Sequence, residues 1–461
     1  MTAPSTQQFK QWYKDHYDEI LQDFFTFLSF PSISTDPQFN QHSRATADWL
    51  CKYMNKMGLE TTLWETPGLP SVFGEYKKAG KHRPTLLIYQ HYDVQPVDPI
   101  ELWKSDPFKP VIKDNKVYAR GASDNKGQCF YSLTAVKAML ELAKELNFNL
   151  KVFIEGEEES GGRGTTAILQ EKKAELKADH LLVIDFDIPG ANEPAITLGM
   201  RGIITLEVEC SNASIDLHSG AHGGIAMNPN RALATLLGQM WDKHGKVQIP
   251  HFYDDLAPLS KDHLSLVDMS FDEERYKKSF GVKAFCNEEG YSIQESNWIR
   301  PTLEINGMSG GYTGQGFKTV IPAKAHAKIS CRLVPNQDPN KIAKAITDYL
   351  TSSAPKGIEI KVNPHHGAPA YRSSFDSFIV KTSALAYEEI FGKPCKYRFC
   401  GASVPIVVDL AKVTEAEVAL IGVAVAEDDI HAPNEHFGLD RFEKGYLIIG
   451  RILSELSTNH K

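Results

Sequence analysis

Runs of consecutive apolar residues alternate with helix-like segments as far as Asp185. A strand buried on both faces is apolar throughout, so these runs predict buried strands at 85–89, 150–155 and 181–184. Shorter strands are expected at 61–66 and 71–76, and a hairpin over 108–120. The segments between them predict helices over 7–30, from Ser43 as N-cap to Gly58, from 121–127 to about 146, and over about 164–172. This alternation is typical of a mainly parallel sheet flanked by helices.

A different pattern begins after Gly202. Apolar and polar residues alternate over 204–210 and again over 323–334, which predicts strands with one solvent-exposed face. Helices are expected after Asn228-Pro229 and Asp338-Pro339, since Pro is favoured at the first helical position. A further strand is expected at 358–362, and 246–300 receives no assignment. After about 372 the first pattern returns, with a helix over 374–391, a strand at 418–422 and a final helix from about 439.

The two patterns predict an α/β fold with an insertion. A mainly parallel-sheet domain is expected from 1–202 and 372–461, and a smaller α+β domain of ferredoxin-like type from 203–371. The length of 461 residues agrees with two domains.

Composition narrows the class of protein. A formal charge of −8 argues against nucleic acid as a partner. No apolar run approaches the ~18 residues that span a bilayer, so no membrane partner is expected. The N-terminal residues lack the features of a signal peptide, and the seven scattered Cys suggest neither a disulfide framework nor a zinc-thiolate site. We therefore expect a cytoplasmic protein.

Residues 155–159, here called the acidic segment, contain four glutamates. Carboxylates about 4 Å apart repel by roughly 4 kcal/mol at an effective dielectric constant near 20. Most charge runs are solvated surface, but this one directly follows a buried-type strand and precedes Gly161-Gly162. Sites in α/β proteins lie at such strand ends. We therefore expect metal cations to supply the missing positive charge.

Further ligand-type residues stand at or just beyond other predicted strand ends. Considered alone, Asp124 is more simply explained as a helix N-cap. A single His at a strand end is more simply explained as a polar residue whose hydrogen bonds are made within the protein. Their joint occurrence indicates a site for zinc, with manganese or cobalt as alternatives; the set is His91, Asp93, Asp124, Asp185 and His431. Since alternate strand residues share a face, Asp93 can hold the ring of His91.

These segments resemble the motifs of the two-metal exopeptidase family that includes carnosinases, cytosolic non-specific dipeptidases, aminoacylases and glutamate carboxypeptidases. The resemblance is closest to the dipeptidase branch and runs through nearly the whole chain in order. It rests on 91–96 (HYDVQP), 121–127 (GASDNKG), the acidic segment, 194–202, 216–220 and 319–322.

The resemblance implies two divalent ions bridged by Asp124. His91 and Asp185 would complete one ion, and Glu159 and His431 the other. Asp185 is preferred to Asp187 because its distance from Pro194 matches the family pattern. The family usually has a cis peptide after the bridging Asp, here Asp124–Asn125.

The resemblance also implies roles within the acidic segment. Glu158 would be the general base that takes a proton from the dimetal-bound water and passes it to the leaving amine. Glu157 would be spectator charge, and Glu155 structural.

The inserted domain would act as a lid and dimerisation domain that brings substrate recognition. Arg332 would bind the free carboxylate of a small peptide. His218 would reach the active site of the partner subunit and stabilise the oxyanion, which implies a homodimer. Other candidates for substrate contact are Thr319, His366 and Ser403.

One segment departs from the family. The stretch that commonly reads Arg-Glu-Gly-Gly-Ser-Ile-Pro is here 399–405 (FCGASVP), with Cys400 at the acidic position and Ala402 at a glycine. The expected activity is hydrolysis of dipeptides or short peptides with a free C-terminal carboxylate. The alternatives are an N-acyl-amino-acid deacylase or desuccinylase, and a metal-binding or scaffolding relative that no longer catalyses.

Overall fold

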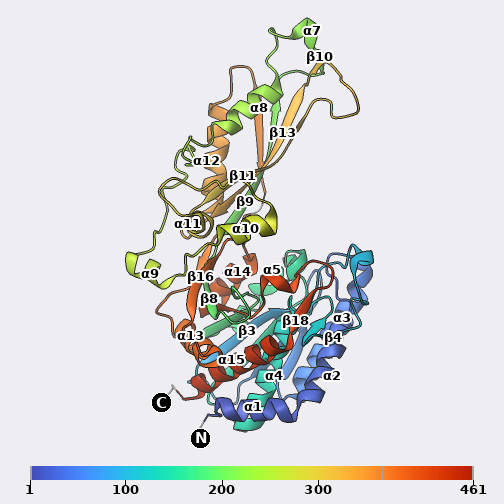
Figure 1. The fold of residues 1–461 in the computed structure, drawn as a ribbon, viewed down its shortest axis with the longest axis vertical. Coiled ribbons are helices and arrows are strands. Elements are labelled where there is room, and N and C mark those ends of the chain that lie inside the picture. The colour runs from blue at the N-terminus through green and yellow to red at the C-terminus, as the bar shows by residue number, and fades with distance from the viewer. Residues whose placement is uncertain (1–2, 366, 459–461) are drawn as a thin grey trace. The chain divides into compact units, whose positions relative to one another are not determined.

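A nine-stranded sheet carries the first part of the fold (Figure 1). The computed structural model describes residues 3–365 and 367–458. The central strands β6, β3, β7 and β17 are parallel neighbours, which confirms the predicted mainly parallel sheet. Every residue of β6 and β7 is buried, as both faces of such strands are covered by helices. The sheet strands are β1 (Glu60–Trp64), β2 (Ser71–Tyr76), β6 (Asn149–Glu155), β3 (Thr85–His91), β7 (His180–Ile184), β17 (Glu417–Ile421), β8 (Ala195–Met200), β15 (Tyr371–Arg372) and β16 (Lys396–Cys400).

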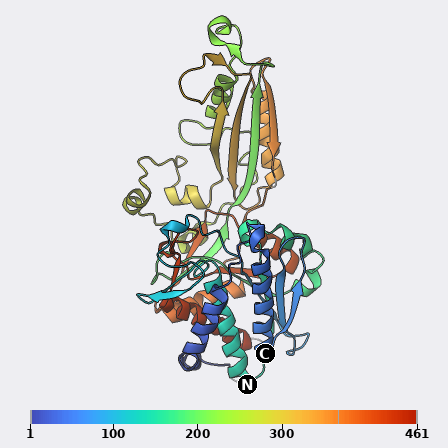
Figure 2. The same cartoon turned by 90° about the vertical axis from the view of Figure 1, so that its right-hand side faces the viewer.

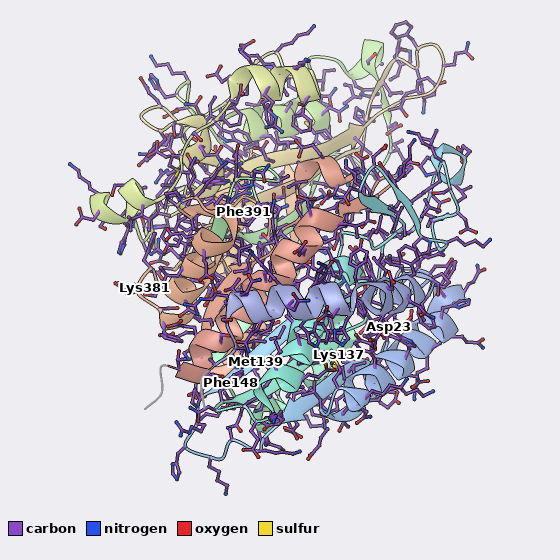
Figure 3. The ribbon with its side chains drawn as sticks, turned by 60° about the horizontal axis from the view of Figure 1, so that its bottom comes forward. Asp23, Lys137, Met139, Phe148, Lys381 and Phe391 are labelled. Atoms are coloured by element: carbon purple, nitrogen blue, oxygen red, sulfur yellow. The ribbon has the colours of Figure 1, made fainter. Side chains whose placement is uncertain are left out.

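Helices cover this sheet and also pack on one another. The long helix α4 packs against the final helix α15 and against α1 and α2. Lys137 of α4, labelled with Asp23 in Figure 3, pairs with Glu19 of α2 at 2.6 Å. The helices are α1 (Thr6–Asp15), α2 (Tyr17–Leu28), α3 (Asn40–Lys56), α4 (Lys126–Ala143), α5 (Arg163–Leu169), α6 (Lys173–Leu176), α13 (Phe378–Phe391), α14 (Pro405–Thr414) and α15 (Leu439–Thr458).

Two predicted helices differ from the structure. The segment 7–30 forms two helices, because His16 leaves helical geometry (ψ 11°) while its ring bonds the Trp12 carbonyl at 2.8 Å. Helix α3 begins at Asn40, and Ser43 is buried inside it rather than capping it. The helix starts early because a 3₁₀ turn at Pro37–Phe39, capped by Asp36, leads directly into it.

A small sheet joins distant parts of the chain. Its order is β18 (His436–Gly438), β5 (Lys116–Tyr118) and β4 (Val111–Lys113), so β4 and β5 form the predicted hairpin. The pairing of β18 with β5 brings the segment after His431 beside the segment before Asp124.

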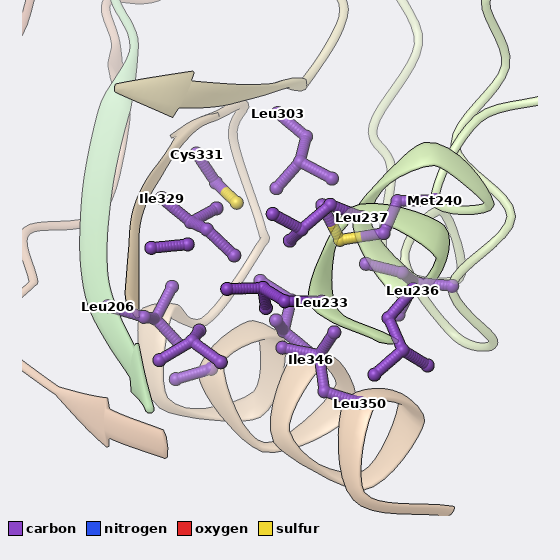
Figure 4. Packing of buried hydrophobic residues seen from close by; sticks show 14 of the residues in the cluster. Leu206, Leu233, Leu236, Leu237, Met240, Leu303, Ile329, Cys331, Ile346 and Leu350 are labelled. Carbon is purple, nitrogen blue, oxygen red and sulfur yellow. The ribbon is translucent and has the colours of Figure 1, made fainter. Parts of the chain in front are cut away.

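The second part of the fold is a four-stranded antiparallel sheet covered on one face by helices, as predicted. Its order is β11 (Thr302–Gly310), β13 (Lys324–Leu333), β9 (Gly202–Ser211) and β14 (Glu359–Pro364). Alternate residues of β13 are buried. They pack on α8 (Pro229–Gly238) and α12 (Pro339–Ser352), and Figure 4 shows Ile329 and Leu206 of the sheet facing Leu233 and Ile346 of these helices. Figure 2 shows α12 running beside the strands.

The unassigned segment 246–300 contains three short helices, α9 (Lys261–Leu266), α10 (Glu273–Phe280) and α11 (Ile293–Trp298). Arg300 forms two hydrogen bonds of 2.8 Å with Glu288. Its guanidinium also lies 4.9 Å and 4.3 Å from the ring centres of Tyr253 and Tyr291. These contacts hold the segment together where hydrophobic periodicity is weak.

The chain forms two compact units. The first comprises Met1–Leu198, Ser373–Arg398 and Asp409–Lys461, and the second Gly199–Arg372 and Phe399–Val408. The short return at Phe399–Val408 is absent from the predicted division. Across the described residues, no helix has both the length and the apolar character needed to cross a membrane.

Candidate metal centre

Five predicted ligands form two groups that share Asp124. One group is His91, Asp124 and Asp185, and the other is Asp124, Glu159 and His431. Within each group the ligand atoms lie within 4.8 Å of one another. All five residues belong to the first unit.

The parallel strands bring these side chains together. His91 is the last residue of β3, and Asp185 directly follows the neighbouring β7. Glu159 lies in a 3₁₀ turn (Glu158–Ser160) just beyond β6, on the other side of β3. Asp124 stands before α4, and the Asp124–Asn125 peptide bond is cis, as expected. The Asn125 amide donates to the carbonyl of Ile184 at 2.9 Å, which ties this loop to the end of β7.

Asp93 links His91 to the acidic segment. The Nε2 atom of His91 lies 3.2 Å from Asp124 and 3.4 Å from Asp185, while Nδ1 lies 3.2 Å from the carboxylate of Asp93. The same carboxylate accepts hydrogen bonds from the backbone N–H groups of Glu158 at 3.2 Å and Glu159 at 3.0 Å. It therefore contacts both the imidazole and the turn that carries the two glutamates.

His431 approaches from the loop after β17. Its Nε2 atom lies 2.8 Å from Asp124 and 3.2 Å from Glu159. The residue has a φ of 62°, in the left-handed region that residues other than Gly rarely adopt. Such backbone conformations concentrate at functional sites. Gln95 holds the other oxygen of Glu159 by a hydrogen bond of 2.7 Å.

Burial and mutual repulsion raise the pKa of several carboxyls here. Burial raises the pKa of Glu159 to about 7 and that of Asp185 to about 6. The pKa of Glu158 lies well above its usual range, because it is buried and faces the charges of Asp185 and Glu159. Burial also opposes the charge of Asp124, but the hydrogen bond from His431 and the nearby imidazole of His91 lower its pKa overall. This is a concentration of negative charge that cations would relieve.

The residues present fit divalent metal ions. The Nε2 atom of His91 and the Oε1 atom of Glu159 are buried without a hydrogen-bond partner, although each faces the other ligands. Buried polar atoms in native proteins are rarely left unpaired. One imidazole and two carboxylates in each group form a donor set suited to zinc and related ions.

Glu157 has a more specific place than spectator charge. A Cβ added to Gly68 would lie 1.9 Å from its Oε1 atom, and one added to Gly164 would lie 2.1 Å from its Oε2 atom. The carboxylate thus occupies a recess that two glycines leave open. Burial raises the pKa of Glu157, and the backbone N–H groups of Leu69 and Gly164 partly offset that rise. Gly164 lies in the first turn of α5, and the free backbone N–H groups at a helix N-terminus stabilise a nearby negative charge.

Glu155 is fully buried, and the hydroxyl of Tyr89 donates a hydrogen bond to it. Burial raises the pKa of Glu155 to about 7. Its side chain is absent from both ligand groups.

The predicted substrate residues form two pairs in the second unit. His218 in β10 (Leu217–His218) pairs in register with Val320 of β12 (Val320–Ile321), next to Thr319. The Arg332 guanidinium donates to the hydroxyl of Ser403 at 2.9 Å. His366 lies outside the described residues.

Two buried carboxylates escaped the sequence analysis. Asp428 accepts hydrogen bonds from Arg441 and, at 2.9 Å, from the Ser123 hydroxyl. Glu435 accepts hydrogen bonds from the loop that carries Asp124. The sequence feature that could have indicated Glu435 is Arg120, next to the 121–127 motif, because a buried Arg requires an acidic partner.

Known proteins match this chain along most of its length. The model of peptidase family M20/M25/M40 matches residues 87–455. A Cys-Gly metallodipeptidase of Schizosaccharomyces pombe is 28% identical over 459 residues, 96% of each chain. The Beta-Ala-His dipeptidase of Homo sapiens is 30% identical and covers 82% of this chain and 75% of its own.

The fold agrees with these matches. The crystal structure of an M20 family metallo-carboxypeptidase from Sulfolobus solfataricus is 33% identical, with a TM-score of 0.83 over 95% of this chain and 99% of that one. The family predicted from the motifs is thereby confirmed. The chain belongs to peptidase family M20/M25/M40 and is a metallopeptidase that acts on peptide bonds.

Proposed function

We propose that this metallopeptidase is a dipeptidase that hydrolyses dipeptides or short peptides with a free C-terminal carboxylate. The observation that carries the proposal is the pair of ligand groups sharing Asp124, with the half-buried Glu158 beside them. The names of the Cys-Gly and Beta-Ala-His dipeptidases, which align along most of their length, support dipeptides as the substrate class.

In this proposal His91, Asp124 and Asp185 hold one divalent ion, and Asp124, Glu159 and His431 hold a second. We propose zinc, because imidazole and carboxylate ligands suit it, with manganese or cobalt as substitutes. Such ions supply positive charge that acidifies a water molecule and polarises a carbonyl. Asp93 keeps the His91 ring oriented through the contact at Nδ1.

Glu158 is proposed to move the proton. Glu158 opens the 3₁₀ turn just beyond β6 and is close enough to Asp185 and Glu159 to interact with their charges, while it belongs to neither ligand group. A carboxylate oxygen of Glu158 takes a proton from the attacking water and delivers it to the leaving amine nitrogen. General acid–base catalysis of this kind contributes about 10²–10⁴-fold to a rate.

Arg332 is proposed to bind the substrate carboxylate. Within the described part of the chain it has no acidic ion-pair partner, and it donates a hydrogen bond to the neutral hydroxyl of Ser403. Arg201 lies nearby: burial and the charge of Arg332 lower the pKa of Arg201 to about 10. Arg201 donates to Gly401, Thr302 and Asn297, so it adds positive charge here, while the donors of Arg332 suit a carboxylate.

The distance between Arg332 and His218 within the second unit supports a homodimer. Lys324, at the end of β13 near Thr319 and His218, is separated from Arg332 by the length of that strand, about 26 Å at about 3.3 Å per residue. Figure 1 shows β10 and α7 (Ser219–His222) beyond that end of β13. A dipeptide spans at most about 7 Å. One substrate can therefore contact Arg332 and His218 only if they come from different chains.

Exposed apolar side chains are frequent in two segments, 215–227, which contains β10, and 308–317, which precedes β12. Phe317 is fully exposed and Ile225 is 81% exposed. Others in the same two segments are Ile215, Met227, Met308 and Tyr312. Large exposed apolar groups that cluster mark interaction surfaces, so we propose that a second copy of the chain covers this end.

A cytoplasmic location is proposed from the cysteines. All seven are free in the structure, as is usual in a reducing compartment.

The test uses metal-stripped protein reconstituted with zinc, manganese or cobalt. Dipeptides should be hydrolysed after reconstitution and not before, and free dipeptides should react much faster than their C-terminal amides. N-acetyl and N-succinyl amino acids form the competing panel. Faster hydrolysis of that panel would replace the dipeptidase proposal by the deacylase alternative, and equal rates for acids and amides would refute the role of Arg332.

A further inference from the structure

Glu435 is a fully buried carboxylate outside both ligand groups. Its Oε2 atom accepts hydrogen bonds from Arg120 Nη1 at 2.8 Å and from the backbone N–H of Gly121 at 2.9 Å. Its Oε1 atom accepts from the backbone N–H groups of Ser123 and Asp124, each at 2.9 Å. One side chain therefore satisfies three backbone donors of the loop that presents Asp124.

The position of Glu435 in the chain adds to this arrangement. It follows His431 by four residues, and its own carbonyl accepts from the backbone N–H of Ala119 at 3.2 Å. The next residue, His436, pairs in register with Tyr118. Backbone and side chain together thus connect the loop that carries His431 to the loop that carries Asp124, which are distant in sequence.

We propose that Glu435 is a positioning residue for the metal centre: it holds the Asp124 loop against the His431 loop so that both ligand groups can share Asp124. The inference rests on the proposed metal site. Side chains that orient metal ligands typically affect metal affinity by about 10–100-fold.

The carboxylate is required because all four donors point at it. An amide in its place has one acceptor and one donor, so Glu435→Gln sets an N–H group against either Arg120 and Gly121 or Ser123 and Asp124. In either orientation two donors lose their acceptor. Glu435→Gln/Arg120→Met also removes the cation that Glu435→Gln leaves buried and unpaired, so this second variant protects the experiment against a failure to fold.

The experiment titrates the metal-stripped full chain with Co²⁺ and records its visible absorption and the number of ions bound. Both variants should bind Co²⁺ at least tenfold more weakly than the unsubstituted chain, with an altered spectrum. Glu288→Gln is the control, since it alters another Arg–Glu pair of low exposure, in the second unit, and should leave affinity and spectrum unchanged.

Two results would overturn the proposal: unsubstituted affinity and spectrum in the variants, or an equal loss of affinity in Glu288→Gln. If the unsubstituted chain itself binds no Co²⁺, the metal site fails, and the positioning role fails with it. If the chain binds Co²⁺ and the variants bind it equally well, the positioning role alone fails.

Discussion

The four glutamates of the acidic segment have different surroundings, although they occupy five consecutive positions. Glu155 is buried against Tyr89, and Glu157 lies in the recess at Gly68 and Gly164. Glu159 belongs to a ligand group, whereas Glu158 only borders it. The division arises because the segment leaves a strand and turns sharply, with Asp93 accepting hydrogen bonds from two consecutive N–H groups.

This division predicts opposite results for two substitutions of equal size. Glu158→Gln should retain the metal content of the unsubstituted protein and lose at least about 100-fold in kcat, because it removes the proton acceptor. Glu159→Gln should lose one ion, because it removes a ligand. Metal analysis after dialysis, together with steady-state rates, measures both. Equal metal loss in the two variants would contradict the assignment.

Gly164→Ala tests the place of Glu157. In a helix, Ala is ordinarily more stable than Gly by up to about 1 kcal/mol. Here the new methyl would lie 2.1 Å from Oε2 of Glu157, and overpacking of this kind costs about 1–3 kcal/mol. The clash should win, so the variant should unfold at lower urea concentration and lose turnover.

The control for that substitution is Gly238→Ala in α8, where a Cβ would meet nothing within 4 Å. It should be neutral or stabilising. A stabilising effect at Gly164 as well would show that Glu157 moves aside freely, and its recess would then have no role in holding the acidic segment.

At the scale of elements, hydrophobic pattern predicted most of the strands and the long helices. The prediction succeeded because the sequence pattern of these strands matches their burial. The apolar runs of β6 and β7 are buried throughout, and the alternating residues of β13 are buried at every second position. The prediction was wrong where a single local contact decides the outcome, as at His16, whose ring bonds the preceding turn. It gave nothing for 246–300, where buried apolar residues such as Val247, Ile249 and Phe252 follow no regular period and Arg300 adds an ion pair.

Arg300→Met therefore should destabilise the protein more than its position in an irregular segment suggests. Arg300 and Glu288 are 13% and 12% exposed, so the substitution leaves a nearly buried carboxylate unpaired and should cost about 2–4 kcal/mol. Urea unfolding at equilibrium measures this loss. Lys277→Met removes an exposed pair with Glu274 in the same segment and should change stability little. Similar effects of both substitutions would rule out a special role for Arg300.

Three candidate ligands, His91, Asp185 and Glu159, could be predicted because each stands at or just beyond a strand end that the pattern already located. Asp124 and His431 lie in loops, and the resemblance to the family motifs indicated them. Glu435 could not be predicted, since its meaning depends on the pairing of β18 with β5, which joins segments far apart in sequence. The recess of Glu157 was missed for a similar reason. It is formed by the absence of side chains at Gly68 and Gly164, and their proximity appears only in three dimensions.

For the whole molecule, the separation of Arg332 from His218 predicts subunit complementation. His218→Ala and Glu158→Gln chains should each be nearly inactive as homodimers. A mixed dimer retains one complete site, with Glu158 from one chain and His218 from the other. Random pairing should therefore restore about a quarter of the unsubstituted activity.

Co-expression of the two chains with different tags measures this recovery, and the purified mixed dimer, with one working site of two, should have about half of the unsubstituted activity. A mixed dimer of the unsubstituted chain with the Glu158→Gln chain supplies the reference for one working site. Inactive mixed dimers would show that His218 does not act in the active site of the partner subunit. A protein that is monomeric in solution would rule out complementation between subunits.

The contact between the Asp124 and His431 loops also sets an order of events during synthesis. A ribosome that has reached Asp185 has already made four of the five ligands and Arg120, yet His431 and Glu435 lie beyond the entire second unit. At about 5–20 residues per second they follow roughly 10–50 s later. During that interval the nascent chain contains the carboxylates of Asp124, Glu159 and Asp185 without His431, and Arg120 without its partner Glu435. Metal uptake at a centre that contains both ligand groups must therefore follow the synthesis of His431.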